Sequence, residues 1–432
     1  MADAEKQAAK KWPYQKRNML GGFIHGVFFQ LGMAFSQSTS VLPAFIHALT
    51  GSSFLVGLLS TLQRTGTILP QLFFANYLES KPLKRPYLLW VIYSRSAIWA
   101  ALGFTVMFVG GGHPTLVTAI LLILLTLFFF VGGLGELVYS YMIARTIAPT
   151  RRGSFFGIRS LLGGLAGIGA GFITHKILLS ADAQSFTGDY GLLFLLTGIS
   201  IAIAGFGFLI MREPADGHVK ESRCMKDYLR ESFSLVKKSP VFRRLLWVIM
   251  LLMGTYLSLP FYVVFARVKL GLPDAYIGFF ITLQIIGQTG SGVAWGWMGD
   301  RWGYRFVLIC VSLASLLPPL WAIFTAASFP DAFAVTFALI GISLKSVELA
   351  VRNYLLEISP DYLVPTCLAL KNTLTAPTLF FPLVGGLLIN FVGYQTLFLI
   401  TAGMISVGAL LSFYLPEPRN ESVNHETGAA DL

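Results

Sequence analysis

The sequence predicts an all-α polytopic membrane protein with twelve transmembrane helices in two pseudo-symmetric six-helix bundles. Three observations lead to this fold class. The 432 residues are 55% hydrophobic and only 12% charged, which is more apolar than a soluble domain of this length. Uncharged runs such as residues 114–135 and 394–414 are long enough to cross the hydrocarbon layer as helices. The two halves of the chain also repeat one another in sequence.

Apolar runs and the polar residues between them place the helices. A helix satisfies its own backbone groups in lipid, whereas an open sheet edge cannot. Residues 19–211 are predicted to form the N-terminal bundle and residues 243–415 the C-terminal bundle. The twelve predicted spans are, in order, residues 19–47, 53–78, 87–109, 114–147, 152–178, 190–211, 243–268, 274–299, 304–325, 330–358, 362–391 and 394–415.

The basic residues between these spans predict the orientation of the chain. In the tails, in the loops and at the ends of the spans, 23 Lys and Arg residues lie on the side of the N-terminus and three, Lys176, Arg267 and Lys269, on the other. The positive-inside rule therefore predicts that both termini and the central loop are cytoplasmic, in the cytoplasmic (inner) membrane of a cell. Because topology accounts for most of the net charge of +11, we expect no nucleic-acid partner.

The segments outside the bundles are polar. We expect cytoplasmic tails at residues 1–18 and 416–432; the first 17 residues lack the apolar core and cleavage site of a signal peptide, so the first helix is expected to be retained. Residues 212–242 carry many charges of both signs and are predicted to be a cytoplasmic linker. Apolar residues at 229, 233 and 236 predict a short helix on the membrane surface within it. Ser239 followed by Pro240 predicts the N-cap and first turn of the seventh helix.

Residues typical of metal sites and of catalysis are few. Cys224, Cys310 and Cys367 lie far apart and match no metal-ligand or redox spacing, so neither a metal nor another cofactor is expected. The sequence contains no HExxH motif, aspartate-rich diphosphate site, Walker loop or nucleophile elbow. These observations argue against an enzyme.

Polar residues carry the internal repeat. Residues 57–66 align without gaps on residues 278–287, sharing two glycines and a Thr-Leu-Gln triplet at an offset of 221. Charged residues in register inside apolar segments are stronger evidence of a repeat than shared leucines. Continued unbroken, this register pairs Glu79 with Asp300 and Lys84 with Arg305, and a second match at an offset of 212 pairs Glu136 with Glu348 and Arg159 with Lys371.

Residues 296–305, Gly-Trp-Met-Gly-Asp-Arg-Trp-Gly-Tyr-Arg, join the eighth and ninth predicted helices. Glycines allow a tight turn, an acid can face a helix N-terminus, and an arginine can bind a carboxylate. This segment resembles the signature loop of the major facilitator superfamily (MFS), Gly-x-x-x-Asp-Arg-x-Gly-x-Arg/Lys, and the helix count, central loop and repeat agree with the resemblance. In that family the loop latches the cytoplasmic side while the cavity faces outward. The resemblance implies this gating role for Asp300, Arg301 and Arg305, and for Glu79 and Lys84 in the first half.

The resemblance implies a secondary active transporter for a small solute, working by alternating access in the lipid bilayer, as a monomer. Two departures from the family pattern keep alternatives open. The loop of the first half, residues 76–85, has Glu79 in place of Asp and no glycine, so its latch is expected to be weaker or differently built. This departure supports a non-transporting sensor or assembly protein of the same fold. The fifth helix lacks the proline seen in the family's drug antiporters, which argues against a drug/proton antiporter but leaves it as a second alternative.

Ionisable residues inside the predicted spans point to a substrate site. Six Lys and Arg residues lie within the spans and away from their ends, and only two acids, Glu136 and Glu348, clearly oppose them. Such residues usually pair or line a hydrated path. We expect Glu136 to pair with Arg159 across a helix hairpin, and three cations to surround Glu348. One carboxylate cannot balance three cations in a low dielectric, which predicts an organic anion as substrate. Alternatively, each acid only neutralises its base and holds two helices together. The predicted substrate-binding residues are Gln30, Gln37, Arg64, Glu136, Arg159, Lys345, Glu348, Arg352 and Lys371.

Other residues in the spans have less specific roles. A carboxylate beside fixed cations can exchange protons, so Glu136 and Glu348 are also the predicted proton-coupling residues, with protons as partners. Gln30 and Gln37 lie one heptad apart, on one face of the first predicted helix, as substrate contacts or as interhelical hydrogen-bond partners. Arg95 is expected to be peripheral and structural, and His25 to be either a packing residue or a proton carrier.

Overall fold

The structure, a computed structural model, describes residue 12 and residues 14–79, 83–179, 185–213, 239–359 and 364–418, with the side chains of residues 69, 72–79, 327–328, 364–366 and 369 left aside. These residues form helices joined by turns and contain no strand. They fall into two compact units. The N-terminal unit holds residues up to Ser52, Leu59–Ser222 and Pro273–Thr282, and the C-terminal unit holds Ser53–Leu58, Arg223–Leu272 and the chain from Leu283.

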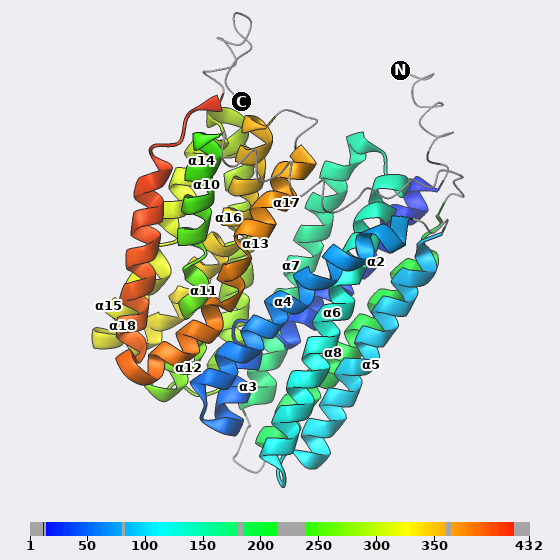
Figure 1. Ribbon diagram of the computed structural model, residues 1–432. Coiled ribbons are helices and arrows are strands. Elements are labelled where there is room, and N and C mark those ends of the chain that lie inside the picture. Colours follow the sequence, from blue (N-terminus) through cyan, green and yellow to red (C-terminus); the bar gives the residue numbers. More distant parts are fainter. Residues whose placement is uncertain are drawn as a thin grey trace, which may run out of the picture. The chain divides into compact units, whose positions relative to one another are not determined.

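Helices α2 to α8 supply most of the N-terminal unit. α5 lies along α8, and α2 packs against both α8 and α7 (Figure 1). The α2–α8 crossing depends on two glycines: a Cβ at Gly207 would lie 2.3 Å from the carbonyl oxygen of Gly21, so the backbones touch only because neither residue has a side chain. The helices are α2 Gln15–Phe35, α3 Val41–Thr50, α4 Ser53–Glu79, α5 Arg85–Val109, α6 Pro114–Thr146, α7 Pro149–Leu179 and α8 Phe186–Ile210.

The first predicted span, residues 19–47, is not one continuous helix. α2 ends at Phe35, and α3 begins at Val41. Between them the carbonyl oxygen of Gln37 accepts hydrogen bonds from the backbone N–H groups of Ser40 and Leu42. The prediction that Gln30 and Gln37 share one helix face was therefore wrong, because Gln37 lies in the turn.

Helices of the C-terminal unit are interrupted more often. The seventh predicted span consists of α10, α11 and α12, separated near Gly254 and Pro260. Gly393, with φ of 76° and ψ of 174°, divides α18. The elements are α10 Pro240–Leu252, α11 Thr255–Ser258, α12 Phe261–Val268, α13 Tyr276–Trp302, α14 Tyr304–Ala314, α15 Leu317–Ser328, η1 Pro330–Ala334, α16 Val335–Ile358, α17 Val364–Leu374, η2 Ala376–Phe380 and α18 Phe381–Ser412.

The capping prediction for the seventh span is confirmed. Ser239 is the N-cap of α10, its Oγ accepts a hydrogen bond from the backbone N–H of Phe242 at 3.2 Å, and Pro240 occupies the first turn. Of the predicted linker, residues 212–213 and 239–242 are described. The predicted surface helix and Cys224 lie outside the described residues, as do most of the two terminal tails.

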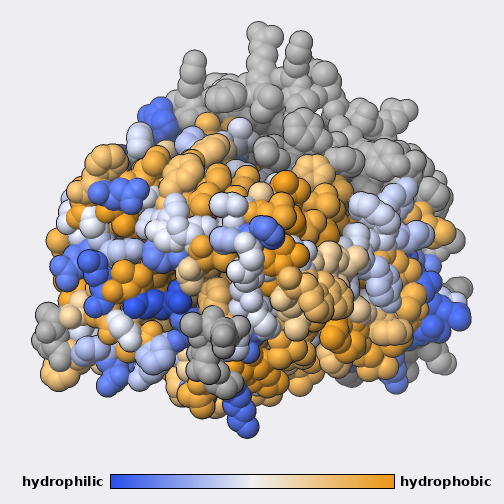
Figure 2. All heavy atoms as spheres, turned by 90° about the horizontal axis from the view of Figure 1, so that it is seen from below, coloured by the Kyte–Doolittle hydropathy of each residue, from blue (hydrophilic) through white to orange (hydrophobic). Residues whose placement is uncertain are grey.

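The surface of the described chain suits a lipid environment. Nine helical segments of the described residues are long and apolar enough to cross a membrane; one of them, residues 376–412, contains the break at Gly393. Twelve spans therefore remain a prediction. Large apolar side chains such as Phe108 and Phe391 are exposed. Figure 2, which shows the molecule from below, has hydrophobic residues mixed with hydrophilic ones on that face. A soluble monomer rarely exposes so much apolar surface.

Candidate functional site

The exposed side of α16 is charged. Lys345, Glu348 and Arg352 are exposed, whereas Val347 and Val351 beside them are buried. Residues three and four positions apart share one face of a helix, so the three form a stripe. Lys345 Nζ lies 3.7 Å from Glu348 Oε2, and the two side chains are 62% and 71% exposed. An ion pair this exposed contributes little to stability, so stability alone does not explain the stripe.

Lys371 joins this stripe from the neighbouring helix. It lies on α17, which packs against α16, and its side chain is partly buried. Both Glu348 and Arg352 are close enough to act on it electrostatically. The structure thus brings together the three cations and the one acid that the sequence grouped. We call Lys345, Glu348, Arg352 and Lys371 the C-terminal charged stripe.

Glu136 and Arg159 do not form the pair that we expected. Glu136 is exposed on α6, and its Oε2 accepts a hydrogen bond of 3.0 Å from Gln71 Nε2 of α4. Arg159 instead turns toward α2, where Gly26 leaves room: a Cβ there would lie 2.4 Å from Arg159 Cγ. No ion pair connects the two residues within the described ranges. Because Gly26 has no side chain, the side chain of Arg159 can pack against α2 at this position.

Arg95 and His25 lie inside the N-terminal unit. The guanidinium carbon of Arg95 lies 4.1 Å from the ring centroid of Phe128 and 4.9 Å from that of Phe29. The expectation that Arg95 is peripheral was therefore wrong. His25 is 7% exposed and stacks on Phe208, with ring centroids 4.2 Å apart. The sequence showed His25 and Phe29 one helical turn apart, but not which arginines face them.

The remaining predicted contacts are partly buried. The Cβ of Gln30 packs at Gly163 of α7, where an added Cβ would lie 3.2 Å away. Arg64 on α4 and Gln37 in the turn after α2 are also partly buried. Within the described residues no group of three His, Cys, Asp or Glu side chains is arranged to hold a metal ion.

The signature loop of the second half connects helix ends within the C-terminal unit. Arg305 Nη2 donates a hydrogen bond of 2.9 Å to the backbone carbonyl of Phe413, after the end of α18. The loop turns at Gly303, whose φ is 86°, and the backbone N–H of Tyr304 at the start of α14 donates to Glu357 Oε2 at 3.3 Å. A glutamate from the end of α16 therefore caps α14.

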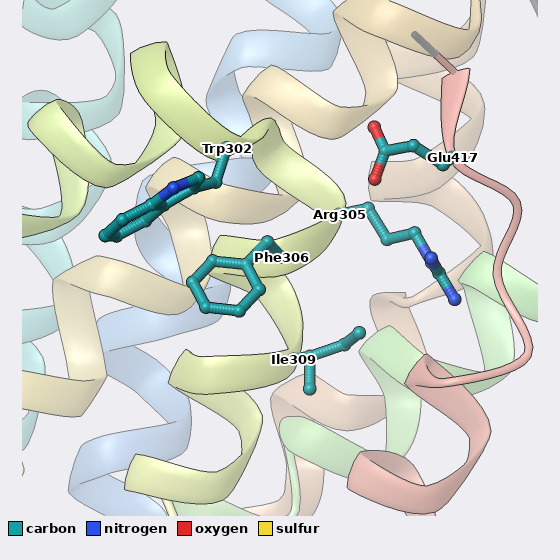
Figure 3. Close-up of a pocket in the computed structure, with 5 residues that line it drawn as sticks. All are labelled: Trp302, Arg305, Phe306, Ile309 and Glu417. Carbon is teal, nitrogen blue, oxygen red and sulfur yellow. The ribbon is translucent and has the colours of Figure 1, made fainter. Parts of the chain in front are cut away.

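A cavity of about 360 Å³ lies beside this loop, lined by Trp302, Arg305, Phe306, Ile309 and Glu417. In Figure 3 the guanidinium of Arg305 points away from the carboxylate of Glu417. Arg305 thus binds a backbone carbonyl rather than this nearby carboxylate. Of the other two loop residues with a predicted gating role, Asp300 is exposed, and the guanidinium carbon of Arg301 lies 5.7 Å from the ring centroid of the nearby Trp297.

In the first half, Arg85 makes the contacts that correspond to those of Arg305. Its Nε and Nη2 donate to the carbonyl oxygens of Phe208 and Leu209 near the end of α8, at 3.0 and 2.7 Å. Lys84, which the repeat paired with Arg305, is buried, with Nζ 3.3 Å from the ring centroid of Tyr141. The contacts therefore shift the predicted register by one residue. The side chain of Glu79 lies outside the described residues.

Glu213, which the sequence did not single out, holds this end of the N-terminal unit together. Its Oε2 accepts hydrogen bonds from the backbone N–H groups of Lys84 and Arg85, at 2.7 and 2.9 Å. Its Oε1 lies 3.9 Å from Arg145 Nη1, and the two side chains are 2% and 14% exposed. A sequence signal was present: a Glu-Pro pair follows the last helix of each half, at Glu213 and at Glu417.

Comparisons with known proteins agree with this fold. Residues 249–430 match the family model described as Major Facilitator Superfamily, and no curated protein is similar enough in sequence to match. A structure titled as a bacterial metal transporter has a TM-score of 0.65 at 14% identity, covering 94% of this chain and 99% of that chain. A bacterial homologue of the iron transporter ferroportin, in the inward-facing state, has a TM-score of 0.69 at 14% identity, covering 92% and 98%.

A D-xylose–proton symporter is similar as well, with a TM-score of 0.64 at 14% identity, covering 94% of this chain and 98% of the symporter. At these identities the structural likeness shows the fold and not the substrate. The family match, in contrast, is a match of sequence over the C-terminal part of the chain. Residues 249–430 thus match the Major Facilitator Superfamily in sequence, and the chain shares the fold of these solved transporters over more than nine-tenths of its length.

Proposed function

We propose that the protein moves a small organic anion across the membrane by alternating access, and that the C-terminal charged stripe binds this anion. One observation carries the proposal: three cations gather around one carboxylate on an exposed helix face. Most exposed large side chains of the unit are apolar, as lipid requires. Charged side chains at membrane depth face water, a partner or a solute instead.

The depth of the stripe supports a hydrated path. Lys345 lies 13 residues before the end of α16 at Ile358, and Arg352 lies six residues before it. At about 1.5 Å per residue the stripe extends from about 20 Å to about 9 Å from that helix end. Arg352 could reach an interface by extending its side chain, but Lys345 lies too deep for this. The stripe therefore leads from the interior toward one side.

The balance of charge selects an anion among small solutes. The solved transporters of this fold are named for metals, nucleosides and D-xylose, so the fold itself does not choose a substrate. Lys345, Arg352 and Lys371 outnumber Glu348 by two charges. Leaving such a charge uncompensated in a low dielectric is costly, and an anionic solute would supply the missing negative charge.

Uptake into proteoliposomes tests the proposal. The panel contains dicarboxylates, aromatic carboxylates and organic phosphates, with D-xylose and uridine as uncharged controls. Lys345→Gln and Arg352→Gln should each reduce anion uptake at least tenfold, the effect of about 1.4 kcal/mol, whereas Arg151→Gln, at an exposed site at the start of α7, should not. Undiminished anion uptake by a Lys345→Gln, Arg352→Gln double variant would refute the assigned site.

The same stripe supports proton coupling through Glu348, and the exposed Glu136 is a second proton-coupling residue in this proposal. A carboxylate beside fixed cations gains or loses its proton as a charged solute arrives or leaves. We expect wild-type uptake to follow an imposed pH gradient. Glu348→Gln should abolish this dependence while keeping exchange of labelled for unlabelled solute. Wild-type uptake that ignores the pH gradient would remove the coupling role and leave the anion site standing.

A further inference from the structure

Four polar side chains of the N-terminal unit meet between four helices. His25 comes from α2, Arg95 from α5, Tyr139 from α6 and Arg159 from α7; we call them the N-terminal cation cluster. His25, Arg95 and Arg159 each lie ten residues into their helices, and Tyr139 lies seven residues before the end of α6. At about 1.5 Å per residue, all four are about 10 to 15 Å from the same end of the unit.

Contacts confirm that the four side chains are neighbours. The guanidinium carbon of Arg159 lies 5.3 Å from the ring centroid of Tyr139, and the same ring lies 5.3 Å from that of His25. Both arginines are close enough to His25 to act on it electrostatically. The guanidinium of Arg95 packs at Gly132 of α6, where an added Cβ would lie 3.1 Å from its central carbon.

Each member of the cluster has a polar atom that lacks a hydrogen bond. His25 Nδ1, Tyr139 Oη and the Nε atoms of Arg95 and Arg159 are buried without a partner among the described residues. At least nine in ten buried polar groups in proteins have a partner. Four such atoms in one place therefore call for an explanation. Aromatic stacking stabilises the faces of the guanidinium groups, but it leaves their N–H donors without acceptors.

The charge of the cluster is only partly compensated. Two arginines are permanently positive, and no ion pair reaches either of them within the described residues. Glu136 lies one turn before Tyr139 on α6 and is close enough to act on Arg95 electrostatically. It is exposed, however, and its hydrogen bond goes to Gln71, so one acid at a distance faces two arginines. Arg95 and Arg159 are themselves only partly buried, so parts of their side chains remain accessible.

We propose that the N-terminal cation cluster is a binding subsite for an oxyanion, the carboxylate or phosphate group of a small solute. Guanidinium groups present planar sets of donors that match both kinds of oxyanion, and the Tyr139 hydroxyl can donate a further hydrogen bond. The surrounding rings of Phe29, Phe128 and Phe208 lower the local dielectric, which strengthens such contacts. As a step in transport this inference rests on the proposed function; as a binding site it stands separately from the C-terminal charged stripe.

Arginine labelling of the wild-type protein tests the subsite directly. Purified full-length protein in detergent is treated with phenylglyoxal, with inorganic phosphate or succinate present or absent, and the labelled residues are identified by mass spectrometry. At least one of the two anions should slow labelling of Arg95 and Arg159 severalfold, and should leave the exposed Arg151 unaffected. The choice between phosphate and succinate distinguishes the two oxyanion chemistries. Equal labelling of Arg95 and Arg159 with and without both anions would overturn the proposal.

Variants supply the second measurement. The protective anion should raise the melting temperature of the wild type, because a ligand of the folded state stabilises it. Arg95→Gln and Arg159→Gln should lose this rise, and Arg95→Lys, which keeps the charge but not the planar donors, should keep only part of it. An unchanged rise in folded Arg95→Gln and Arg159→Gln would also refute the subsite. Protection at Arg95 that persists in a Lys345→Gln, Arg352→Gln variant would show that the subsite binds its anion independently of the C-terminal charged stripe.

Discussion

Two glutamates at equivalent positions of the two halves make different contacts. Glu213 and Glu417 both follow the last helix of their half, yet only Glu213 reaches the N-terminus of a helix, α5, where it accepts two backbone hydrogen bonds. Free N–H groups at a helix start carry partial positive charge, and Arg145 adds a full charge at 3.9 Å. The Oε1 atoms of both Glu213 and Glu417 are buried without a hydrogen bond among the described residues, so the two carboxylates differ in the hydrogen bonds that Glu213 Oε2 accepts.

We predict that Glu213→Ala lowers the free energy of unfolding by about 3 kcal/mol. The substitution removes an acceptor of charge-assisted hydrogen bonds and leaves Arg145 and the start of α5 without their carboxylate. Glu417→Ala is the matched control, and it should be neutral or stabilising because its carboxylate is poorly satisfied. Thermal unfolding of the two purified variants checks the difference. Equal losses of stability would show that the hydrogen bonds of Glu213 contribute little.

At the scale of elements, helix packing here depends on where side chains are absent. A Cβ added at Gly207 would lie 2.3 Å from the carbonyl oxygen of Gly21 and 2.7 Å from the backbone nitrogen of His25. Neither atom can move without shifting α2. Because α2 also carries His25 and Gly26, the α2–α8 crossing positions two residues that face Arg159.

Gly207→Ala should therefore destabilise the protein and reduce any anion protection of Arg159. The control is Gly403→Ala on α18, where an added Cβ meets nothing within 4 Å. In an open helix position this exchange stabilises by up to about 1 kcal/mol, because alanine is the better helix former. Melting temperatures of the two variants should move in opposite directions. A rise for both would mean that α2 and α8 separate without cost.

Elements whose signals are local were predictable, and contacts across the chain were not. Ser239 and Pro240 marked the start of α10 because capping depends on neighbouring residues. Gly393 likewise stood between the last two predicted spans. The Glu-Pro pair marks Glu213, but the cap of Glu213 on Lys84 joins residues 129 positions apart, and no local pattern reveals this partner. The N-terminal cation cluster could not be predicted for the same reason. The sequence placed Arg95 in a helix, but it did not show which helices would surround this residue.

For the whole molecule, contacts within each unit show which helix ends lie together. In the N-terminal unit the start of α5, the end of α6 and the end of α8 meet around Glu213. In the C-terminal unit the start of α14 meets the end of α18 through Arg305. These are ends that the distribution of Lys and Arg assigns to the cytoplasm. The contacts show which helix ends lie together within each unit. Which side of the membrane these ends face is predicted by the distribution of Lys and Arg alone.

Labelling of cysteines in intact cells checks this orientation. Cys224 lies in the predicted cytoplasmic linker, outside the described residues, and Gly112 lies in the exposed turn between α5 and α6, where a side chain meets nothing. In a Cys310→Ala, Cys367→Ala background, a membrane-impermeant maleimide should label Gly112→Cys in intact cells. Cys224 should react only after permeabilisation, because 23 Lys and Arg residues on its side favour the cytoplasm. Labelling of Cys224 in intact cells would invert the orientation, and labelling of both positions from one side would contradict the odd number of spans predicted between them.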